Sequence, residues 1–388
     1  MDNKYIVIAA TVLVLAAVAI GFTVMNDSSE EDDEKSTVTI TDLAGREVKI
    51  SYPVERIVCG DAEAMSMIAA VAGEDFGDML VGYDSNLHTY YPDVAKMWSD
   101  AIDGFDKKTP VGSFQDGSFN WETVASLNPD VVFIPMWIYA YGMMSEETVN
   151  QMANAGIAIV NLDLYVDLFN EEVMDRNCEV LGKIFKNEDK AKKIGDFYGE
   201  QINAVSKIAS GIAPNEKSYY IELLVQLGNY GSAKPSSPTG DLEYLYQKNI
   251  MTGGNGVINA EDFATSGVEY VFFMTFNGFA ECGSHMGWGA TVTASDIEKI
   301  NESLAKRNGW TSTPAVQNGN VIFFDQVFNC SFENWFIYQV IAQSMYPDLY
   351  SALDPVANLE GFYEEYLPWV DLKGVWYFTS DGEIGATA

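Results

Sequence analysis

Basic residues are scarce in this chain of 388 residues, which carries 22 Lys and Arg against 56 Asp and Glu. The formal net charge of −34 at pH 7 excludes a nucleic-acid-binding protein, because that class holds phosphates with basic side chains that displace counterions. Arginine, the rigid bidentate partner of carboxylates and phosphates, is especially rare, which disfavours strongly anionic ligands. The four arginines are Arg46, Arg56, Arg176 and Arg307.

Histidine and cysteine are also rare. The two histidines, His88 and His285, are too few for a zinc or manganese site of several imidazoles. The four cysteines have no spacing typical of a metal site, and we predict no metal ligands and no cofactor. Cys282 and Cys330 each follow an apolar run typical of a strand, so in an oxidising exterior they form either a disulfide or two buried thiols.

Catalytic motifs are missing too. The sequence contains no G-x-S-x-G elbow, no Walker-type phosphate loop and no H-E-x-x-H zinc motif. We therefore predict that the protein is not an enzyme. The alternative is an extracellular protein that binds haem or catalyses a reaction through the loop of Cys282 and His285, because a thiolate with a histidine base is a nucleophile and histidine ligates haem iron.

The N-terminus is the most apolar part of the chain. Residues 5–25 carry no charge, and about 20 apolar residues match a hydrocarbon core of about 30 Å. Lys4 precedes this run and an acidic stretch follows it, which places the rest of the chain outside the cell. We predict a transmembrane signal-anchor helix over 1–26 and an acidic tether over 27–36, with the bulk extracytoplasmic. A secretory signal cleaved near Ala17 and Ala19 is the alternative.

Short apolar runs alternate with helical stretches from residue 37 onward. A hairpin over 37–50 precedes strands at 56–59, 80–83, 131–135 and 157–162, with helices at 62–71, 121–127 and 146–155. Repeated strand, loop and helix of this length indicate a parallel sheet covered on both faces.

Residues 170–210 are helical and almost free of Gly and Pro, with a second helix from Glu188 to Ser210 about 35 Å long. A second series follows, with strands at 218–225, 268–275 and 320–324 and helices near 241–247, 295–305 and 333–345. We predict an N-terminal α/β lobe (37–187), a rigid connecting helix (188–210) and a C-terminal α/β lobe (211–388).

The loops after the predicted strands are rich in aromatic side chains and neutral hydrogen-bonding groups. Ligands of open α/β sheets bind at these strand ends, and such side chains suit a large, flat or greasy ligand in an aromatic cleft. The predicted ligand-binding residues are Tyr83, Asn86, Phe114, Gln115, Trp137, Tyr139, Tyr165, Tyr230, Phe276, Asn277, Trp288 and Phe328.

Five phrases together resemble one family, the solute-binding proteins of ABC importers for iron-siderophore complexes, haem and vitamin B12 (class III periplasmic binding proteins). They are TDLAGREVKI with ERIVCGDAEAMSMIAAVAG, then VGSFQDGSFNWETVASLNPDVVFIP, then LGKIFKNEDKAKKI, then GWTSTPAVQNGNVIFFD, and AQSMYPDLY. The resemblance covers residues 37 to about 367. It implies two chelatase-like (Rossmann-like) lobes with parallel sheets, joined by one long rigid helix.

The resemblance also implies a function. We expect an extracytoplasmic receptor that captures an iron(III)-siderophore-type chelate or a corrinoid such as cobalamin between its lobes and delivers it to an ABC permease. The scarcity of arginine favours a less anionic chelate than catecholate siderophores. Glu122 and Glu261 match the two glutamates that dock on the permease in that family. The anchoring cysteine of bacterial members is missing, and the N-terminal helix is expected to tether the chain to the cell membrane instead.

Overall fold

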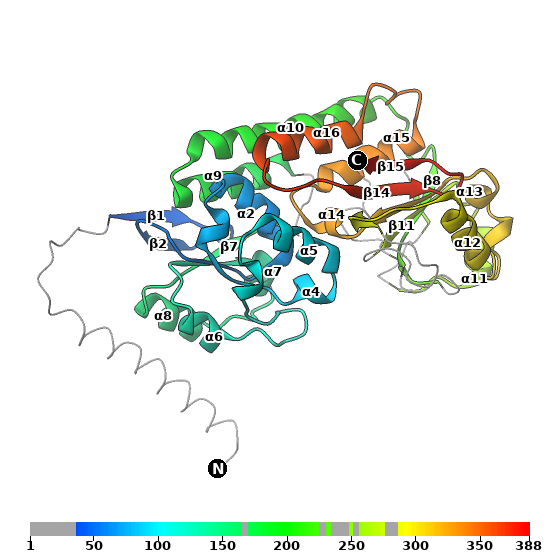
Figure 1. The fold of residues 1–388 in the computed structure, drawn as a ribbon. Coiled ribbons are helices and arrows are strands. Elements are labelled where there is room, and N and C mark those ends of the chain that lie inside the picture. The colour runs from blue at the N-terminus through cyan, green and yellow to red at the C-terminus, as the bar shows by residue number, and fades with distance from the viewer. Residues whose placement is uncertain (1–35, 165–169, 225–229, 234–247, 251–255, 276–285) are drawn as a thin grey trace, which may run out of the picture. The chain divides into compact units, whose positions relative to one another are not determined.

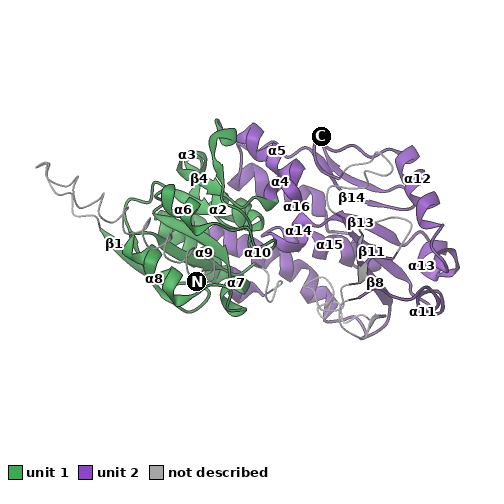
Figure 2. Ribbon diagram, turned by 90° about the horizontal axis from the view of Figure 1, so that it is seen from below, with its two compact units in different colours: residues 1–86, 104–164, 175–192 green, residues 87–103, 165–174, 193–388 purple. Residues whose placement is uncertain are grey.

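The computed structural model describes residues 36–388 apart from 165–169, 225–229, 234–247, 251–255 and 276–285 (Figure 1). The chain divides into two compact units that are not continuous in sequence (Figure 2). Unit 1 comprises residues 1–86, 104–164 and 175–192, and unit 2 comprises residues 87–103, 165–174 and 193–388.

A hairpin begins the described part of unit 1, as the sequence predicts. Strands β1 (Thr37–Thr41) and β2 (Glu47–Ser51) pair antiparallel, with Ile40 opposite Val48. Arg46 holds the turn between them, because its guanidinium donates to the Asp42 carboxylate at 2.6 Å and to the Asn161 side-chain oxygen at 2.7 Å. This arginine therefore has a structural role.

The main sheet of unit 1 has five parallel strands in the order β5-β4-β3-β6-β7. They are β3 (Ile57–Cys59), β4 (Leu80–Tyr83), β5 (Thr109–Pro110), β6 (Val131–Pro135) and β7 (Ala158–Leu162). The four strands predicted here are confirmed. Every residue of β6 and β7 is buried, as expected for a parallel sheet covered on both faces.

Helices cover both faces of this sheet. On one face, α6 (Trp121–Ser126) and α8 (Glu146–Asn154) contribute Val124 and Met152 to a core with Val132 and Ile134 of β6. On the other face, Phe133 of β6 meets Phe185 of α9 (Glu171–Phe185), with ring centroids 6.0 Å apart. Helix α2 (Met65–Ala72) directly follows a 3-10 helix at 62–64. The other short helical segments described in this unit are α3 (Phe76–Met79), a 3-10 helix at 105–107 and α7 (Met136–Ala140).

The predicted long helical region is confirmed. Helix α9 is followed by Lys186, whose φ of 53° lies in the left-handed region and ends the helix. Helix α10 (Glu188–Ala209) then runs for 22 residues, or about 33 Å, with two acidic residues in its first turn. Its first five residues group with unit 1 and the rest with unit 2.

The sheet of unit 2 has the order β10-β8-β11-β13-β14-β12. Strands β8 (Ser218–Leu224), β10 (Lys248–Asn249), β11 (Tyr270–Thr275) and β13 (Val321–Asp325) are parallel. Four strands pair antiparallel: β9 (Ser232–Ala233), β12 (Gly287–Trp288), β14 (Gly374–Thr379) and β15 (Ile384–Thr387). The mixed α/β class is confirmed, and the antiparallel edge is an addition that the sequence did not predict.

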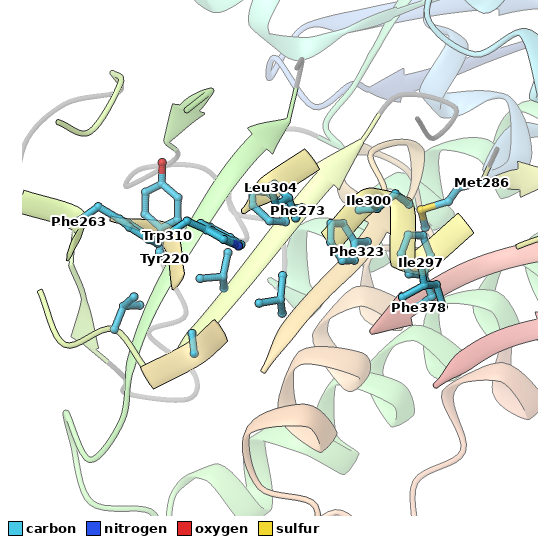
Figure 3. Close-up of a cluster of buried hydrophobic side chains, with 14 of the residues drawn as sticks. Tyr220, Phe263, Phe273, Met286, Ile297, Ile300, Leu304, Trp310, Phe323 and Phe378 are labelled. Atoms are coloured by element: carbon cyan, nitrogen blue, oxygen red, sulfur yellow. The ribbon is translucent and has the colours of Figure 1, made fainter. Parts of the chain in front are cut away.

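Aromatic side chains build the core on one face of this sheet (Figure 3). Trp310 stacks on Phe263 of α11 (Ala260–Thr265) with ring centroids 5.5 Å apart, and α12 (Ala294–Leu304) adds Ile297, Ile300 and Leu304. The other helices of this face are the 3-10 turn at 310–312 and α13 (Pro314–Gln317). The helix predicted near 295–305 is confirmed, and the one predicted near 241–247 lies outside the described residues.

Three helices pack together elsewhere in unit 2. Phe197 of α10 meets Trp335 of α15 (Asn334–Met345) and Phe362 of α16 (Pro355–Tyr366), with ring centroids 5.4 and 5.5 Å apart. Helix α15 is predicted from the sequence, whereas α16 and α5 (Pro92–Ala101) are not. The short helices α4 (Asn86–Thr89) and α14 (Val327–Cys330) complete the described elements.

No helix in the described part of the chain is both long enough and apolar enough to cross a membrane. The predicted signal-anchor over 1–26 and residues 27–35 of the predicted acidic tether lie outside that part.

Candidate functional site

Two buried carboxyl groups follow neighbouring strands of the parallel sheet in unit 1. Asp61 comes two residues after β3 and Asp84 directly follows β4, and their exposed fractions are 4% and 6%. Carboxyl ends of adjacent parallel strands share one edge of the sheet, which is where ligands of such sheets bind. We take this edge as the candidate site of unit 1.

Hydrogen bonds fix both carboxyl groups. Asp84 accepts from the backbone N–H of Asn86 at 2.8 Å and from the Ser113 hydroxyl at 3.4 Å. Asp61 accepts from the backbone N–H of Glu63 at 3.1 Å. The side-chain nitrogen of Asn86 is buried and has no hydrogen-bond partner among the described residues. A buried amide without a partner is a donor that a bound water or ligand would satisfy.

Burial changes the protonation of this edge. Burial, with a smaller contribution from the nearby charge of Asp61, raises the pKa of Asp84 to about 7. Burial also raises the pKa of Asp61 to about 6. Near pH 7 Asp84 is therefore about half protonated and Asp61 is mostly ionised, so the edge offers an O–H donor as well as acceptors. Such an edge suits a neutral or weakly charged polar ligand better than an anion.

The raised pKa of Asp84 makes stability depend on pH. An unfolded aspartate has a pKa of about 3.9, so between about pH 4 and 7 the folded chain binds more protons at this group than the unfolded chain. The free energy of unfolding therefore falls as pH rises through that window. Asp84→Asn is expected to flatten this fall and to raise stability at pH 8, relative to pH 5, by about 2 kcal/mol.

The urea-denaturation midpoints of the wild type and the variant, measured at pH 5 and pH 8, test this expectation. Asp116→Asn is the matched control, because Asp116 is exposed and hydrogen bonds from Ser118 lower its pKa. Its effect on the midpoint should be the same at both pH values. An Asp84→Asn variant with the pH dependence of the wild type would show that this carboxyl does not gain protons on folding.

The other predicted ligand-binding residues that the structure describes in unit 1 fall into two groups, buried and accessible. Tyr83 and Phe114 are buried, and they stack on Phe105 at 4.9 Å and on Phe119 at 3.9 Å between ring centroids. Both therefore pack within the unit. Three predicted residues are accessible instead: Trp137 is half-buried, and Gln115 and Tyr139 are exposed.

In unit 2 the structure describes three of the predicted aromatic residues. Trp288 is half-buried with its ring centroid 5.8 Å from that of buried Phe328. Tyr230 is half-buried and its hydroxyl donates to the Asn308 carbonyl at 2.9 Å. The other predicted residues of this half, Phe276 and Asn277, lie outside the described residues, and so does Tyr165.

A buried polar run begins at the last residue of β13, and from it only Phe328 was among the predicted ligand-binding residues. Asp325, Gln326, Asn329 and Asn334 are all at least nine-tenths buried. The Gln326 and Asn329 amides donate to the Cys330 sulfur at 3.4 and 3.5 Å. The Gln326 side-chain oxygen and the Asn334 side-chain nitrogen have no partner among the described residues. The signal was present as the run DQVFNCSFEN directly after an apolar strand.

Cys330 is one of the two cysteines for which a disulfide was considered, and Cys282 lies outside the described residues. That pairing stays a prediction. Within the part of the chain that the structure describes, no three His, Cys, Asp or Glu side chains gather as a metal site.

The two predicted docking glutamates have similar positions in their units. Glu122 lies in the first turn of α6, where Asn120 caps the helix by accepting from the Thr123 N–H at 2.9 Å. Glu261 lies in the first turn of α11, where Asn259 accepts from its backbone N–H at 2.8 Å. Both are exposed. Each is therefore accessible to a partner and favoured by the helix dipole.

Comparison with known proteins gives one family and a set of similar folds. The family model described as periplasmic binding protein matches residues 57–327. The TroA-like periplasmic binding protein FepB from Veillonella parvula is 24% identical, with a TM-score of 0.78, over 88% of this chain and 99% of that one. No curated protein matches the sequence.

Two further solved structures are similar at lower identity. CeuE from Helicobacter pylori, in a complex with nickel and histidine, is 16% identical with a TM-score of 0.58, over 87% of this chain and 97% of that one. A periplasmic heme binding protein from Pseudomonas aeruginosa is 16% identical with a TM-score of 0.51, over 76% and 94%. At these identities the similarity shows the fold.

Proposed function

Because this chain belongs to the periplasmic binding protein family, we propose that its ligand is a bulky metal chelate, either of the iron(III)-siderophore type or a corrinoid. As a member of that family it is an extracytoplasmic solute-binding protein of the ABC importer type, and it is not an enzyme. Its partners are the ligand and a permease. The proposal concerns which ligand it binds, which residues bind it, and how the chain is held at the membrane.

The observation that carries the proposed ligand class is the neutral polar character of the strand ends. The carboxyl ends of β3 and β4 carry carboxyl groups whose pKa is raised toward neutrality, and the carboxyl end of β13 carries buried amides. Such groups bind a ligand through neutral hydrogen bonds. Unit 1 adds the accessible aromatic side chains Trp137 and Tyr139, and unit 2 adds Trp288. Each set suits contact with a large chelate of low charge.

The arginines support the same ligand class, because three of the four are engaged elsewhere. Arg46 pairs with Asp42 in the N-terminal turn, Arg56 donates to the Leu127 carbonyl at 2.6 Å, and Arg307 pairs with Glu222 inside unit 2. The fourth, Arg176, is exposed on α9. A strongly anionic catecholate chelate would require positive charge at the site.

The names of similar structures support a metal complex as ligand but differ in its kind. One is a heme binding protein and another holds nickel and histidine. Haem is therefore the second ligand to test. His285, the residue proposed as its iron ligand, lies outside the described residues.

We further propose that residues 5–25 hold the chain at the cell membrane as an uncleaved helix, and that residues 27–36 form a solvated tether. The support is the uncharged run followed by an acidic, serine-rich stretch without apolar residues to bury.

Tryptophan fluorescence of the full chain in mild detergent tests the ligand class. Titration with a ferric hydroxamate and with cobalamin is expected to give saturable quenching by at least one of them. Replacing Gln115 and Tyr139 together with alanine should weaken that ligand about tenfold or more, through loss of a hydrogen bond and of aromatic contact. Leu349→Ala, which also removes an exposed side chain, should leave the affinity unchanged.

Two results would contradict the proposal. If neither a ferric hydroxamate nor cobalamin quenches the fluorescence, the ligand class is wrong. If haem alone binds and His285→Ala abolishes that binding, the haem alternative replaces the chelate. A chelate receptor should tolerate His285→Ala with little change in affinity.

A further inference from the structure

Unit 2 contains a cavity of about 230 Å³ beside α5 and β12, and Trp288 is the one predicted ligand-binding residue among the described residues that line it. Two indole rings line it, those of Trp288 and Trp369. Three carboxylates and two lysines also line it. The cavity is smaller than the sites of drug-sized ligands, so it suits a small molecule.

Four of the charged residues form ion pairs with one another. Lys96 lies 2.5 Å from Asp100, and Lys373 lies 3.7 Å from Asp371. All four side chains are well exposed, so each lysine charge is offset by a carboxylate next to it and by solvent. The third carboxylate, Asp93, gives the lining a net negative charge.

Asp93 is one half of a pair of carboxyl groups. Its Oδ2 accepts from the backbone N–H of Trp288 at 3.1 Å. A Cβ atom added to Gly287 would lie 2.0 Å from Asp93 Oδ2 and 3.0 Å from Asp325 Oδ2, so both oxygens converge on this glycine. Only a residue without a side chain fits between them.

Asp325 makes this pair unusual. It is 1% exposed, and its Oδ2 is buried without a hydrogen-bond partner among the described residues. Burial and the adjacent Asp93 carboxylate raise its pKa well above the usual range. Asp325 lies behind Asp93 and is not among the residues that line the cavity, but a positive charge bound beside Asp93 would favour the ionised form of both carboxyl groups.

We propose that this cavity binds a small organic ammonium ion, with its charge beside Asp93 and its alkyl groups against Trp288 and Trp369. Indole rings attract alkylated ammonium groups by cation–π interaction, which contributes about 0.5 to 2 kcal/mol. A bare divalent cation fits less well, because it requires several oxygen ligands and no three acidic, His or Cys side chains among the described residues are placed to hold a metal ion. The cavity shares Trp288 with the residues proposed for the chelate, whereas Asp93 and Trp369, which the test below replaces, line the cavity and are not among those residues.

Isothermal titration calorimetry with choline as the probe tests the proposal. The full chain is expected to bind choline saturably below about 10 mM, and to bind dimethylbutanol, its uncharged carbon isostere, about tenfold more weakly or less. Asp93→Asn keeps an acceptor for the Trp288 N–H but removes the charge, and it should weaken choline about tenfold. Trp369→Ala should weaken it about fivefold.

Glu216→Gln is the control, since it removes the same charge from an exposed position outside the cavity, and it should bind choline like the wild type. Thermal denaturation of each variant verifies that it is folded. If Asp93→Asn does not fold, the loss of choline binding in Trp369→Ala tests the proposal instead. Equal binding of choline and its isostere, absence of saturable binding, or binding of calcium in place of choline would each overturn the proposal.

Discussion

Replacing Glu122 and Glu261 together with lysine is expected to abolish import while leaving the affinity for the ligand unchanged. Both glutamates are exposed in the first turns of helices, one in each unit. If they dock on basic residues of the permease, the double reversal turns two attractive contacts into repulsion. Like charges placed together at an interface weaken binding by several kcal/mol, which corresponds to a loss of about a hundredfold or more.

Uptake of a radiolabelled chelate by cells that carry the cognate importer measures this effect. The matched control is Glu55→Lys with Glu216→Lys, which makes the same charge change at two exposed positions before β3 and β8. The control pair should support normal uptake. Fluorescence titration and thermal denaturation should show that ligand binding and folding survive in both double variants. Normal uptake by the Glu122 and Glu261 variant would reject these residues as the docking contacts.

Arg307→Met is expected to destabilise unit 2 by about 3 to 5 kcal/mol. The Arg307 and Glu222 side chains have no exposed surface, and their closest N–O distance is 2.9 Å. Tyr220 also donates to Glu222 at 2.8 Å, and the guanidinium lies 5.0 to 5.4 Å from the ring centroids of Tyr230, Phe273 and Trp310. Without the arginine, a carboxylate is left buried and unpaired, which is much less favourable than the intact pair.

Urea denaturation followed by tryptophan fluorescence measures this loss. Lys299→Met breaks an exposed ion pair with Asp296 at 3.4 Å, and should change stability by less than about 1 kcal/mol. Adding Glu222→Gln to Arg307→Met removes the unpaired charge and should restore more than half of the stability. A loss below about 1 kcal/mol for Arg307→Met would show that the pair is not a main support of this core.

Periodic segments were predictable from the sequence, and short or uniformly buried ones were not. The helices α9 and α10 show clear helical periodicity, and the parallel strands are apolar runs with turns at both ends. The strand β14 has six buried residues and therefore no alternation, so its antiparallel pairing leaves no signal in the pattern. Helix α5 begins at Pro92, between the predicted strand at 80–83 and the predicted helix at 121–127, in a stretch for which no element was predicted.

The candidate site was predictable only where a single strand end defines it. Asn86 was predicted because it follows a clear strand, and its side chain is buried at that strand end, whereas Tyr83 and Phe114 are packed in the interior. An aromatic residue at a strand end has the same sequence signature whether it packs or binds a ligand. Asp93 and Asp325 were missed because they lie far apart in the sequence and meet only at Gly287 in the folded chain.

Native mass spectrometry of the full chain, released from detergent in the presence of a ferric hydroxamate, cobalamin or haem, tests the chelate receptor most directly. One chelate bound per chain is expected for a ferric hydroxamate or cobalamin, and loss of that adduct is expected when Gln115 and Tyr139 are both replaced with alanine. A spectrum that shows only the unliganded mass with every one of these chelates would contradict this expectation.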